Sequence, residues 1–284
     1  MINEIGVIGA GVIGTGVATV FAKYGFKTIT IDIDSNQLEC AKQKIKQDIR
    51  YYNLLHKGTK ITADEIFDSL TFSTNINDLS RCKFIIENVT ENWDIKKNIY
   101  LKIDKICAEE CIVGVNTSAI PITKIASLTS RKEKIIGIHF MNPVTLITHL
   151  EVIKGEHTST ETIEKTTAYL SNIDKTITIV NDFPGFVSNR ISHLFMNEAA
   201  FTVQDQVAKP EDVDIIFKNC FGHKMGPLQT ADLIGLDTVL NTLIVLYENF
   251  RDPKYRPCPL LAKMVDAGYL GVKSGKGFYT YTLD

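Results

Sequence analysis

The sequence predicts an α/β domain, in which helices flank a parallel sheet, followed by an all-helical C-terminal domain. Short apolar runs alternate with segments of helical period over the first half of the chain, a pattern typical of parallel sheets. The first run leads through a glycine-rich turn into an apolar helix. From Asp182-Phe183-Pro184-Gly185 onward only helical patterns recur. We therefore predict domains at residues 1–183 and 184–284.

The N-terminal segment carries the most specific pattern of the chain. Ile5 to Ile8 reads as a buried strand, Gly9-Ala10-Gly11-Val12-Ile13-Gly14 as a turn, and the apolar stretch to Phe21 as a helix. A second strand, Thr28 to Ile31, ends in Asp32. This order of strand, glycine turn, helix and acidic residue is the fingerprint of Rossmann-type dinucleotide-binding domains.

Each glycine of the turn has a physical role in binding a dinucleotide. Gly9 permits the tight turn, Gly11 lets the backbone approach a pyrophosphate, and Gly14 lets the helix pack closely on the strand. The pyrophosphate then lies at the helix N-terminus, where N–H groups and the helix dipole favour negative charge. We expect the cofactor to contact this turn through Gly9, Gly11, Val12, Ile13 and Gly14.

Asp32 indicates which dinucleotide binds. Its carboxylate is placed to accept hydrogen bonds from both hydroxyls of the adenosine ribose and to repel a 2′-phosphate. The next residues, Ile33-Asp34-Ser35-Asn36, contain no Arg or Lys that would accommodate that phosphate. The sequence therefore predicts NAD rather than NADP.

The remaining elements follow from periodicity and end signals. A long helix after Asp32 is expected to have Ser35 as its N-cap and to end at Lys57-Gly58. Its several lysines either form a solvated face or hold a phosphorylated carrier arm. Further strands are predicted at Phe84–Glu87, Ile112–Val115, Ile135–Phe140, Leu150–Ile153 and Thr176–Val180, and further helices at Trp93–Cys107, Thr160–Asn172, Phe186–Gln206, Pro210–Phe221, Gly235–Phe250 and Pro259–Ala267.

Composition limits the classes of partner. The net charge is −2 and no long basic run occurs, which argues against nucleic acid as the main partner. No apolar run reaches the roughly 18 residues of a membrane span. We expect the N-terminal segment to be the first strand rather than a signal peptide. The six cysteines include no CxxC pair, so we expect reduced thiols in a cytoplasmic protein and no metal site.

Four polar residues stand where chemistry is expected. Ser118 follows the strand at Ile112–Val115, His139 ends the next apolar strand, Glu151 lies in a later strand, and Asn189 begins the helical domain. Each alone has an ordinary structural explanation. Together they suit hydride transfer, because imidazole exchanges a proton near neutral pH, a carboxylate orients it, and hydroxyl and amide donors stabilise charge on a substrate oxygen.

These residues also carry a family resemblance. The chain resembles the 3-hydroxyacyl-CoA dehydrogenase family over essentially its whole length, especially the short bacterial 3-hydroxybutyryl-CoA dehydrogenases. The matching motifs, in order, are Val7-Ile8-Gly9-Ala10-Gly11 with Gly14, Glu87 to Glu91-Asn92, Asn116-Thr117-Ser118, His139-Phe140 with Asn142-Pro143, Glu151-Val152-Ile153, Pro184-Gly185-Phe186-Val187 with Asn189-Arg190, Met225-Gly226-Pro227, Gly235-Leu236-Asp237, and Lys273-Ser274-Gly275-Lys276-Gly277-Phe278-Tyr279.

The resemblance implies a role for each candidate residue. His139 matches the catalytic acid–base and Glu151 its carboxylate partner, while Ser118 and Asn189 match the residues that hydrogen-bond the substrate oxygen. It also implies a homodimer formed through the helical domain. Glu91 and Asn116 match positions along the nicotinamide half of the cofactor, and Lys96 matches another cofactor contact. Asn142 is expected close to the cleft of Ser118 and Asn189, and Lys57 matches the region that meets the CoA phosphates.

Three segments depart from the family pattern. Relatives commonly read Asn-Thr-Ser-Ser-Leu where this chain has Ala119-Ile120 after Ser118, and His-Phe-Phe-Asn-Pro where it has Met141. Before the catalytic carboxylate, the usual Met-Lys-Leu-Val-Glu is replaced by Ile147-Thr148-His149-Leu150-Glu151. In a strand His149 and Glu151 share a face, so His149 either perturbs Glu151 or contacts substrate, or points to a void or solvent.

The leading hypothesis is an NAD-dependent dehydrogenase that interconverts a short-chain 3-hydroxyacyl-CoA and its 3-oxoacyl form. One alternative keeps this chemistry but takes the hydroxyacyl group from an acyl carrier protein, as in polyketide extender-unit pathways. Another substrate class is a free hydroxy acid or sugar acid, as in the related gulonate dehydrogenases. A different class altogether is a catalytically silent NAD-binding protein.

Overall fold

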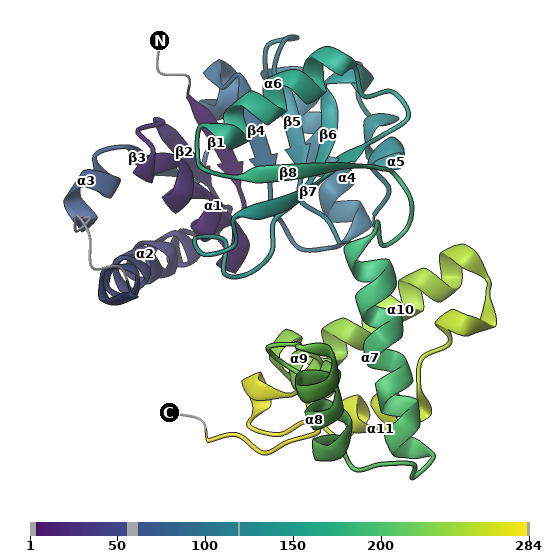
Figure 1. The fold of residues 1–284 in the computed structure, drawn as a ribbon. Coiled ribbons are helices and arrows are strands. Elements are labelled where there is room, and N and C mark those ends of the chain that lie inside the picture. The colour runs from purple at the N-terminus through teal and green to yellow at the C-terminus, as the bar shows by residue number, and fades with distance from the viewer. Residues whose placement is uncertain (1–3, 56–61, 119, 283–284) are drawn as a thin grey trace. The chain divides into compact units, whose positions relative to one another are not determined.

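A computed structural model describes residues 4–55, 62–118 and 120–282. The chain divides into two compact units, Met1–Asp182 and Phe183–Asp284. The first contains one eight-stranded sheet with helices, and the second is built from helices (Figure 1). The predicted α/β fold class with a helical C-terminal domain is confirmed.

The sheet has the order β3-β2-β1-β4-β5-β6-β7-β8, and all neighbouring strands are parallel except the antiparallel pair β6 and β7. Reversal between β6 and β7 brings the end of one strand beside the start of the next. The strands are β1 (Ile5–Ile8), β2 (Thr28–Ile31), β3 (Leu70–Ser73), β4 (Phe84–Glu87), β5 (Ile112–Val115), β6 (Ile135–His139), β7 (His149–Lys154) and β8 (Thr176–Asn181).

Helices connect the parallel strands of the first unit and make up most of the second. Those of the first unit are α1 (Val12–Lys23), α2 (Ser35–Leu55), α3 (Ala63–Phe67), α4 (Trp93–Ile106), α5 (Ile122–Ala126) and α6 (Thr160–Ser171). Those of the second are α7 (Ser188–Gln204), α8 (Pro210–Phe221), α9 (Pro227–Ile234), α10 (Leu236–Phe250) and α11 (Pro259–Asp266). Short 3₁₀ helices lie at Ile76–Arg81, Lys132–Lys134, Pro253–Tyr255 and Val272–Ser274.

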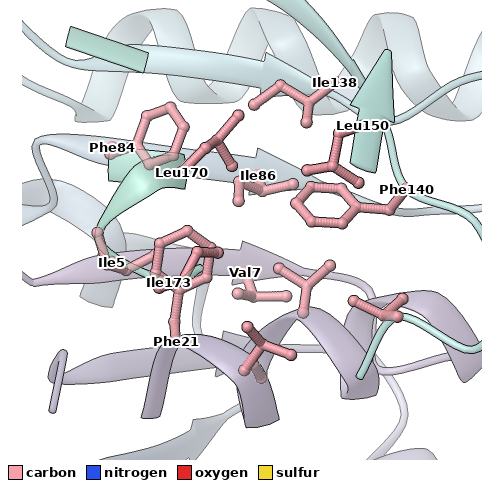
Figure 2. Close-up of a cluster of buried hydrophobic side chains, with 14 of the residues drawn as sticks. Ile5, Val7, Phe21, Phe84, Ile86, Ile138, Phe140, Leu150, Leu170 and Ile173 are labelled. Atoms are coloured by element: carbon pink, nitrogen blue, oxygen red, sulfur yellow. The ribbon is translucent and has the colours of Figure 1, made fainter. Parts of the chain in front are cut away.

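The core of the first unit lies where α1 and α6 pack on the sheet. Phe21 of α1, Leu170 of α6 and alternate residues of the strands form one buried cluster, shown in Figure 2. Gly16 of α1 faces Val144, and a Cβ built on this glycine would come within 2.8 Å of the valine Cβ. The loop after β6 therefore packs directly on the first helix.

The start of α2 and the strand β3 differ from the sequence expectation. The prediction that Ser35 caps the long helix is wrong, because the helix already begins at Ser35 and the preceding Asp34 carboxylate accepts a hydrogen bond from Asn36 N. Strand β3 was not predicted. Its four residues lie at the sheet edge and are only partly buried, so they lack the continuous apolar run of the central strands.

The end of the first unit is tied to α5. The N-cap position of this helix is Pro121, whose side chain makes no capping hydrogen bond. Instead Asp182 accepts hydrogen bonds from Ile122 N at 3.0 Å and from Thr123 N at 2.7 Å. A carboxylate distant in the sequence thus does the work of an N-cap.

No single described helix is both long and apolar enough to cross a bilayer. Helices α9 and α10 meet that criterion only when they are taken together, and they are bent by 98° at the break between them.

Candidate active site

The glycine turn after β1 has the geometry that a bound pyrophosphate needs. Gly9 has a φ of +90°, in the region that side-chain-bearing residues avoid, and a Cβ on Gly14 would lie 1.8 Å from Gly9 O. At Gly11, no described atom outside the glycine and its two chain neighbours lies within 4 Å of the position that a Cβ would occupy. The first N–H groups of α1, at Val12 and Ile13, begin just beyond. The turn therefore offers a helix N-terminus and space above it for a phosphate.

Asp32 is held next to this turn by backbone amides. One carboxylate oxygen accepts a hydrogen bond from Ala10 N at 2.8 Å and the other from Asp34 N at 3.1 Å. The side chain is half-buried at the end of β2. A carboxylate fixed in this way at the carboxyl end of β2 fits the ribose of a dinucleotide, so the residues present suit NAD.

Asn116 joins the carboxyl ends of three neighbouring strands. It follows β5, and its Nδ2 donates to Asn88 Oδ1 after β4 at 3.0 Å. Its Oδ1 accepts from the backbone N of Phe140, which directly follows β6, at 3.1 Å. One amide side chain thus fixes the spacing of these strand ends.

The loop that carries Ser118 is organised by Glu91. The Glu91 carboxylate accepts hydrogen bonds from the Thr117 hydroxyl, from Ser118 N at 3.2 Å and from Ile120 N at 3.3 Å. Thr117 Oγ1 also accepts from Ile120 N at 2.9 Å. This side chain therefore shapes the turn on which the Ser118 hydroxyl stands.

His139 and Glu151 face each other across the antiparallel pair of strands. They are register partners at the end of β6 and the start of β7, and His139 Nδ1 lies 3.2 Å from Glu151 Oε2. Both residues are buried. Their pairing follows from the antiparallel register of β6 and β7, in which residue 151 lies opposite residue 139.

His149 lies on the same strand as Glu151 but turns toward β8. Its Nδ1 is 2.8 Å from Thr176 Oγ1 and its Nε2 is 2.9 Å from Thr178 Oγ1, so both ring nitrogens are engaged by threonines. The ring is exposed. Of the two interpretations left open by the sequence, these contacts favour a surface residue over one that perturbs Glu151.

The other predicted site residues are more scattered. Asn142 follows β6, is exposed and is joined to Pro143 by a cis peptide bond. Asn189 is the second residue of α7 in the second unit. Lys57 lies outside the described residues. On α2, Lys42 pairs with Glu39 at 2.6 Å and Lys44 with Asp48 at 2.5 Å, as expected of a solvated helix face.

Lys96 is buried, although the family resemblance implies that it contacts the cofactor. Its side chain has no exposed area, and its ammonium bonds both oxygens of Glu87 and the backbone oxygen of Asn116. Glu87 and its second partner Tyr100 were not predicted as site residues. A glutamate ending the otherwise apolar run Phe84-Ile85-Ile86 was the available signal, because a buried strand does not need a charge.

Among the described residues, no group of three His, Cys, Asp or Glu side chains is arranged to hold a metal ion. All six cysteines are free thiols.

Comparison with known families assigns both units. Residues 4–183 match the NAD-binding domain of 3-hydroxyacyl-CoA dehydrogenase, and residues 185–281 match its C-terminal domain. These matches confirm the resemblance inferred from the motifs and confirm NAD as the cofactor.

Individual relatives agree along the whole chain. A probable 3-hydroxybutyryl-CoA dehydrogenase of Bacillus subtilis is 41% identical over 280 residues, which cover 99% of this chain and 98% of the relative. A 3-hydroxybutyryl-CoA dehydrogenase of Bradyrhizobium diazoefficiens is 38% identical, with 99% and 96% covered. The crystal structure of (S)-3-hydroxybutyryl-CoA dehydrogenase PaaH1 from Ralstonia eutropha is similar with a TM-score of 0.94 and 38% identity, covering 100% of both chains. This chain belongs to the 3-hydroxyacyl-CoA dehydrogenase family and is an NAD-dependent oxidoreductase.

Proposed function

We propose that this enzyme interconverts a short-chain 3-hydroxyacyl-CoA and its 3-oxoacyl form. The observation that carries the proposal is the buried His139–Glu151 pair, at 3.2 Å, at the carboxyl end of β6. The names of the relatives from Bacillus subtilis and Bradyrhizobium diazoefficiens support a four-carbon acyl group on CoA. Bound NAD would supply the hydride acceptor or donor.

His139 acts as the acid–base for the substrate hydroxyl. In the oxidation it takes the hydroxyl proton as hydride leaves C3, and in the reduction it returns that proton. Glu151 at Nδ1 fixes the ring orientation, assigns proton exchange to Nε2 and favours the imidazolium that forms. The same two groups therefore serve both directions.

The remaining candidates bind and orient. Ser118 and Asn189 donate hydrogen bonds to the substrate oxygen, where negative charge develops during hydride transfer. Glu91, Lys96, Asn116 and Asn142 form the environment of the nicotinamide half of the cofactor, and Gly9, Gly11, Val12, Ile13, Gly14 and Asp32 that of the adenosine half. Lys57 remains the proposed contact for the CoA phosphates.

A panel of thioesters tests the substrate assignment. We expect NADH formation from (S)-3-hydroxybutyryl-CoA, measured by absorbance, at a kcat/KM well above that for the same acyl group on an acyl carrier protein. Free 3-hydroxybutyrate and a sugar acid serve as controls for substrates without a thioester. Activity only on the carrier-protein thioester, only on a free acid, or on none of these compounds would contradict the assignment and favour the corresponding alternative.

Asp32 provides a test of the cofactor geometry. We expect Asp32→Ala to reduce the preference for NAD over NADP, because the variant loses the carboxylate that bonds the ribose hydroxyls and repels a 2′-phosphate. The preference is measured as the ratio of kcat/KM values for the two cofactors. An unchanged ratio would remove Asp32 from the proposed ribose contact.

His149 serves as the matched imidazole for assigning the acid–base. We expect His149→Leu to retain most of the wild-type kcat, because both ring nitrogens face threonines of β8 rather than Glu151. Steady-state kinetics with the best thioester of the panel measures the effect. A loss of kcat as large as that at His139 would mean that the wrong imidazole was assigned.

We also propose that the enzyme is a homodimer in the cytoplasm. The helices of the second unit expose large apolar side chains, including Ile191 of α7, Phe221 of α8 and Leu233 of α9, which are 64%, 66% and 60% exposed. Side chains of this kind would form a dimer interface where they gather into a contiguous apolar patch. Free thiols suit a reducing compartment. Light scattering on the purified protein should give the mass of two chains, and a mass of one chain would contradict the dimer.

A further inference from the structure

A buried ion pair lies between β4 and α4. Glu87 is the last residue of β4, while Lys96 and Tyr100 are four residues apart on α4, and all three side chains have no exposed area. Lys96 Nζ donates to both Glu87 oxygens, at 2.9 and 2.8 Å, and the Tyr100 hydroxyl donates to Glu87 Oε2 at 2.8 Å. Residues four apart on a helix share a face, so the helix presents both donors to one carboxylate.

A fully buried ion pair such as Glu87–Lys96 adds little to the stability of a fold. Taking two ions out of water costs more than their attraction returns unless the geometry is excellent, and well-packed apolar residues of similar volume often replace such pairs without loss of stability. The pKa of Tyr100 lies well above its ordinary value, because burial and the adjacent Glu87 carboxylate disfavour the phenolate. The hydroxyl therefore remains a donor to Glu87 across the working pH range.

The remaining contacts of Lys96 point to the carboxyl edge of the sheet. Its Nζ donates to Asn116 O at 3.1 Å and lies 3.8 Å from Glu91 Oε2. Glu87 Oε1 also accepts from Val89 N at 2.6 Å, just after β4. The buried ammonium thus touches the segments that follow β4 and β5, together with the carboxylate that shapes the Ser118 turn.

The two partners of Lys96, Glu91 and Asn116, are in turn bonded to the segments that carry Ser118 and His139. Glu91 holds the Thr117 hydroxyl and the Ser118 and Ile120 amides. Asn116 holds the amide of Phe140, the residue next to His139. A shift of the Lys96 ammonium would therefore be transmitted to Ser118 through Glu91 and to the end of β6 through Asn116.

We propose that Glu87 and Tyr100 are positioning residues for hydride transfer, which act by holding the Lys96 ammonium against Asn116 and Glu91. Neither side chain is placed to touch substrate or cofactor, since both are fully buried. The inference rests on the proposed function, because it takes Ser118 and His139 as the groups that are positioned. It adds two buried residues that would influence the reaction through the contacts of Lys96 with Asn116 and Glu91.

Tyr100→Phe is the sharpest variant, since it removes one hydroxyl group and leaves the aromatic ring in place. We expect kcat on the best thioester of the panel to fall about tenfold, with NADH affinity changed by less than about twofold. Tyr24→Phe is the matched control, because the Tyr24 hydroxyl donates to Asp174 at 2.6 Å, a carboxylate with no contact to this network among the described interactions. The control should keep the wild-type kcat.

A measurement without substrate accompanies the kinetics. Hydrogen-exchange mass spectrometry on the free proteins should show faster exchange of the Ser118, Ile120 and Phe140 amides in Tyr100→Phe than in the wild type, and no such change in Tyr24→Phe. Glu87→Gln, which keeps shape but removes the charge, should enlarge both effects, and Glu87→Asp should restore part of kcat. A purely structural role would lower the melting temperature without this local pattern or the split between kcat and NADH affinity.

The outcomes separate this inference from the proposed function. A wild-type enzyme inactive on every thioester contradicts the proposed function, while the exchange comparison still decides whether the network holds the loop. A kcat of Tyr100→Phe within twofold of the wild type, or unchanged exchange at the three amides, overturns the positioning role. A loss confined to NADH affinity also overturns it, because the network would then serve cofactor binding rather than the positions of Ser118 and His139.

Discussion

Replacing His139 with glutamine is expected to lower kcat by at least about 100-fold while NADH binding persists. Glutamine has an amide N–H that can donate to Glu151, so the buried carboxylate keeps a partner and the strand pair β6–β7 keeps its register. The amide cannot take up a proton near neutral pH, so the acid–base step is lost. The reaction is followed by NADH absorbance and cofactor binding by NADH fluorescence.

Two comparisons make this experiment decisive. His149→Leu removes an imidazole from the same sheet without touching Glu151, and it should remain active. Glu151→Gln should reduce kcat less than His139→Gln, because it weakens the stabilisation of the imidazolium but leaves the ring in place. Near-normal turnover in His139→Gln would remove this residue from its proposed role.

Replacing Lys96 with methionine is expected to destabilise the first unit by about 3–5 kcal/mol. The methionine side chain fills a similar volume, but the Glu87 carboxylate is left buried opposite an uncharged group. The chain contains one tryptophan, Trp93, which stands at the start of α4, so its fluorescence during urea unfolding reports on this region. The double variant Glu87→Gln/Lys96→Met should recover part of the loss, because neither charge then remains.

A surface lysine gives the control for this prediction. Lys42 pairs with Glu39 one helical turn away on α2, and both side chains reach solvent. Lys42→Met should change stability by no more than about 1 kcal/mol, since exposed ion pairs contribute little. If Lys96→Met changed the free energy of unfolding as little as Lys42→Met, the buried Glu87 carboxylate would not need the Lys96 ammonium as its partner.

The cofactor-binding segment was predictable in detail because its determinants are local. Gly9, Gly11 and Gly14 shape a single turn within six residues of chain, and Asp32 directly follows the next strand of the same unit. The family assignment followed from motifs of the same local kind. The sequence also placed most central strands and helices within two residues of their observed ends, since their apolar runs and periods are long.

Residues with partners distant in the sequence escaped prediction. Glu87 and Tyr100 were missed because a single charge or phenol in an apolar segment does not reveal its partner. Asp182 was read as a marker of the domain boundary, yet its carboxylate caps α5 about sixty residues earlier. The orientation of the His149 ring depends on the threonines of β8 that lie beside β7. The sequence of β7 alone does not reveal which strand pairs with it.

The sequence by itself determined the fold class, the family and the dinucleotide turn, because periodicity and glycine geometry act over short stretches of chain. It also nominated His139 and Glu151. Only the tertiary structure decided that the two side chains meet, through the reversed strand β7, and that a buried ammonium links Asn116 to Glu91 behind them. The physical reason is that a hydrogen bond needs two groups within about 3 Å, and the folded sheet alone sets that distance for residues far apart in the chain.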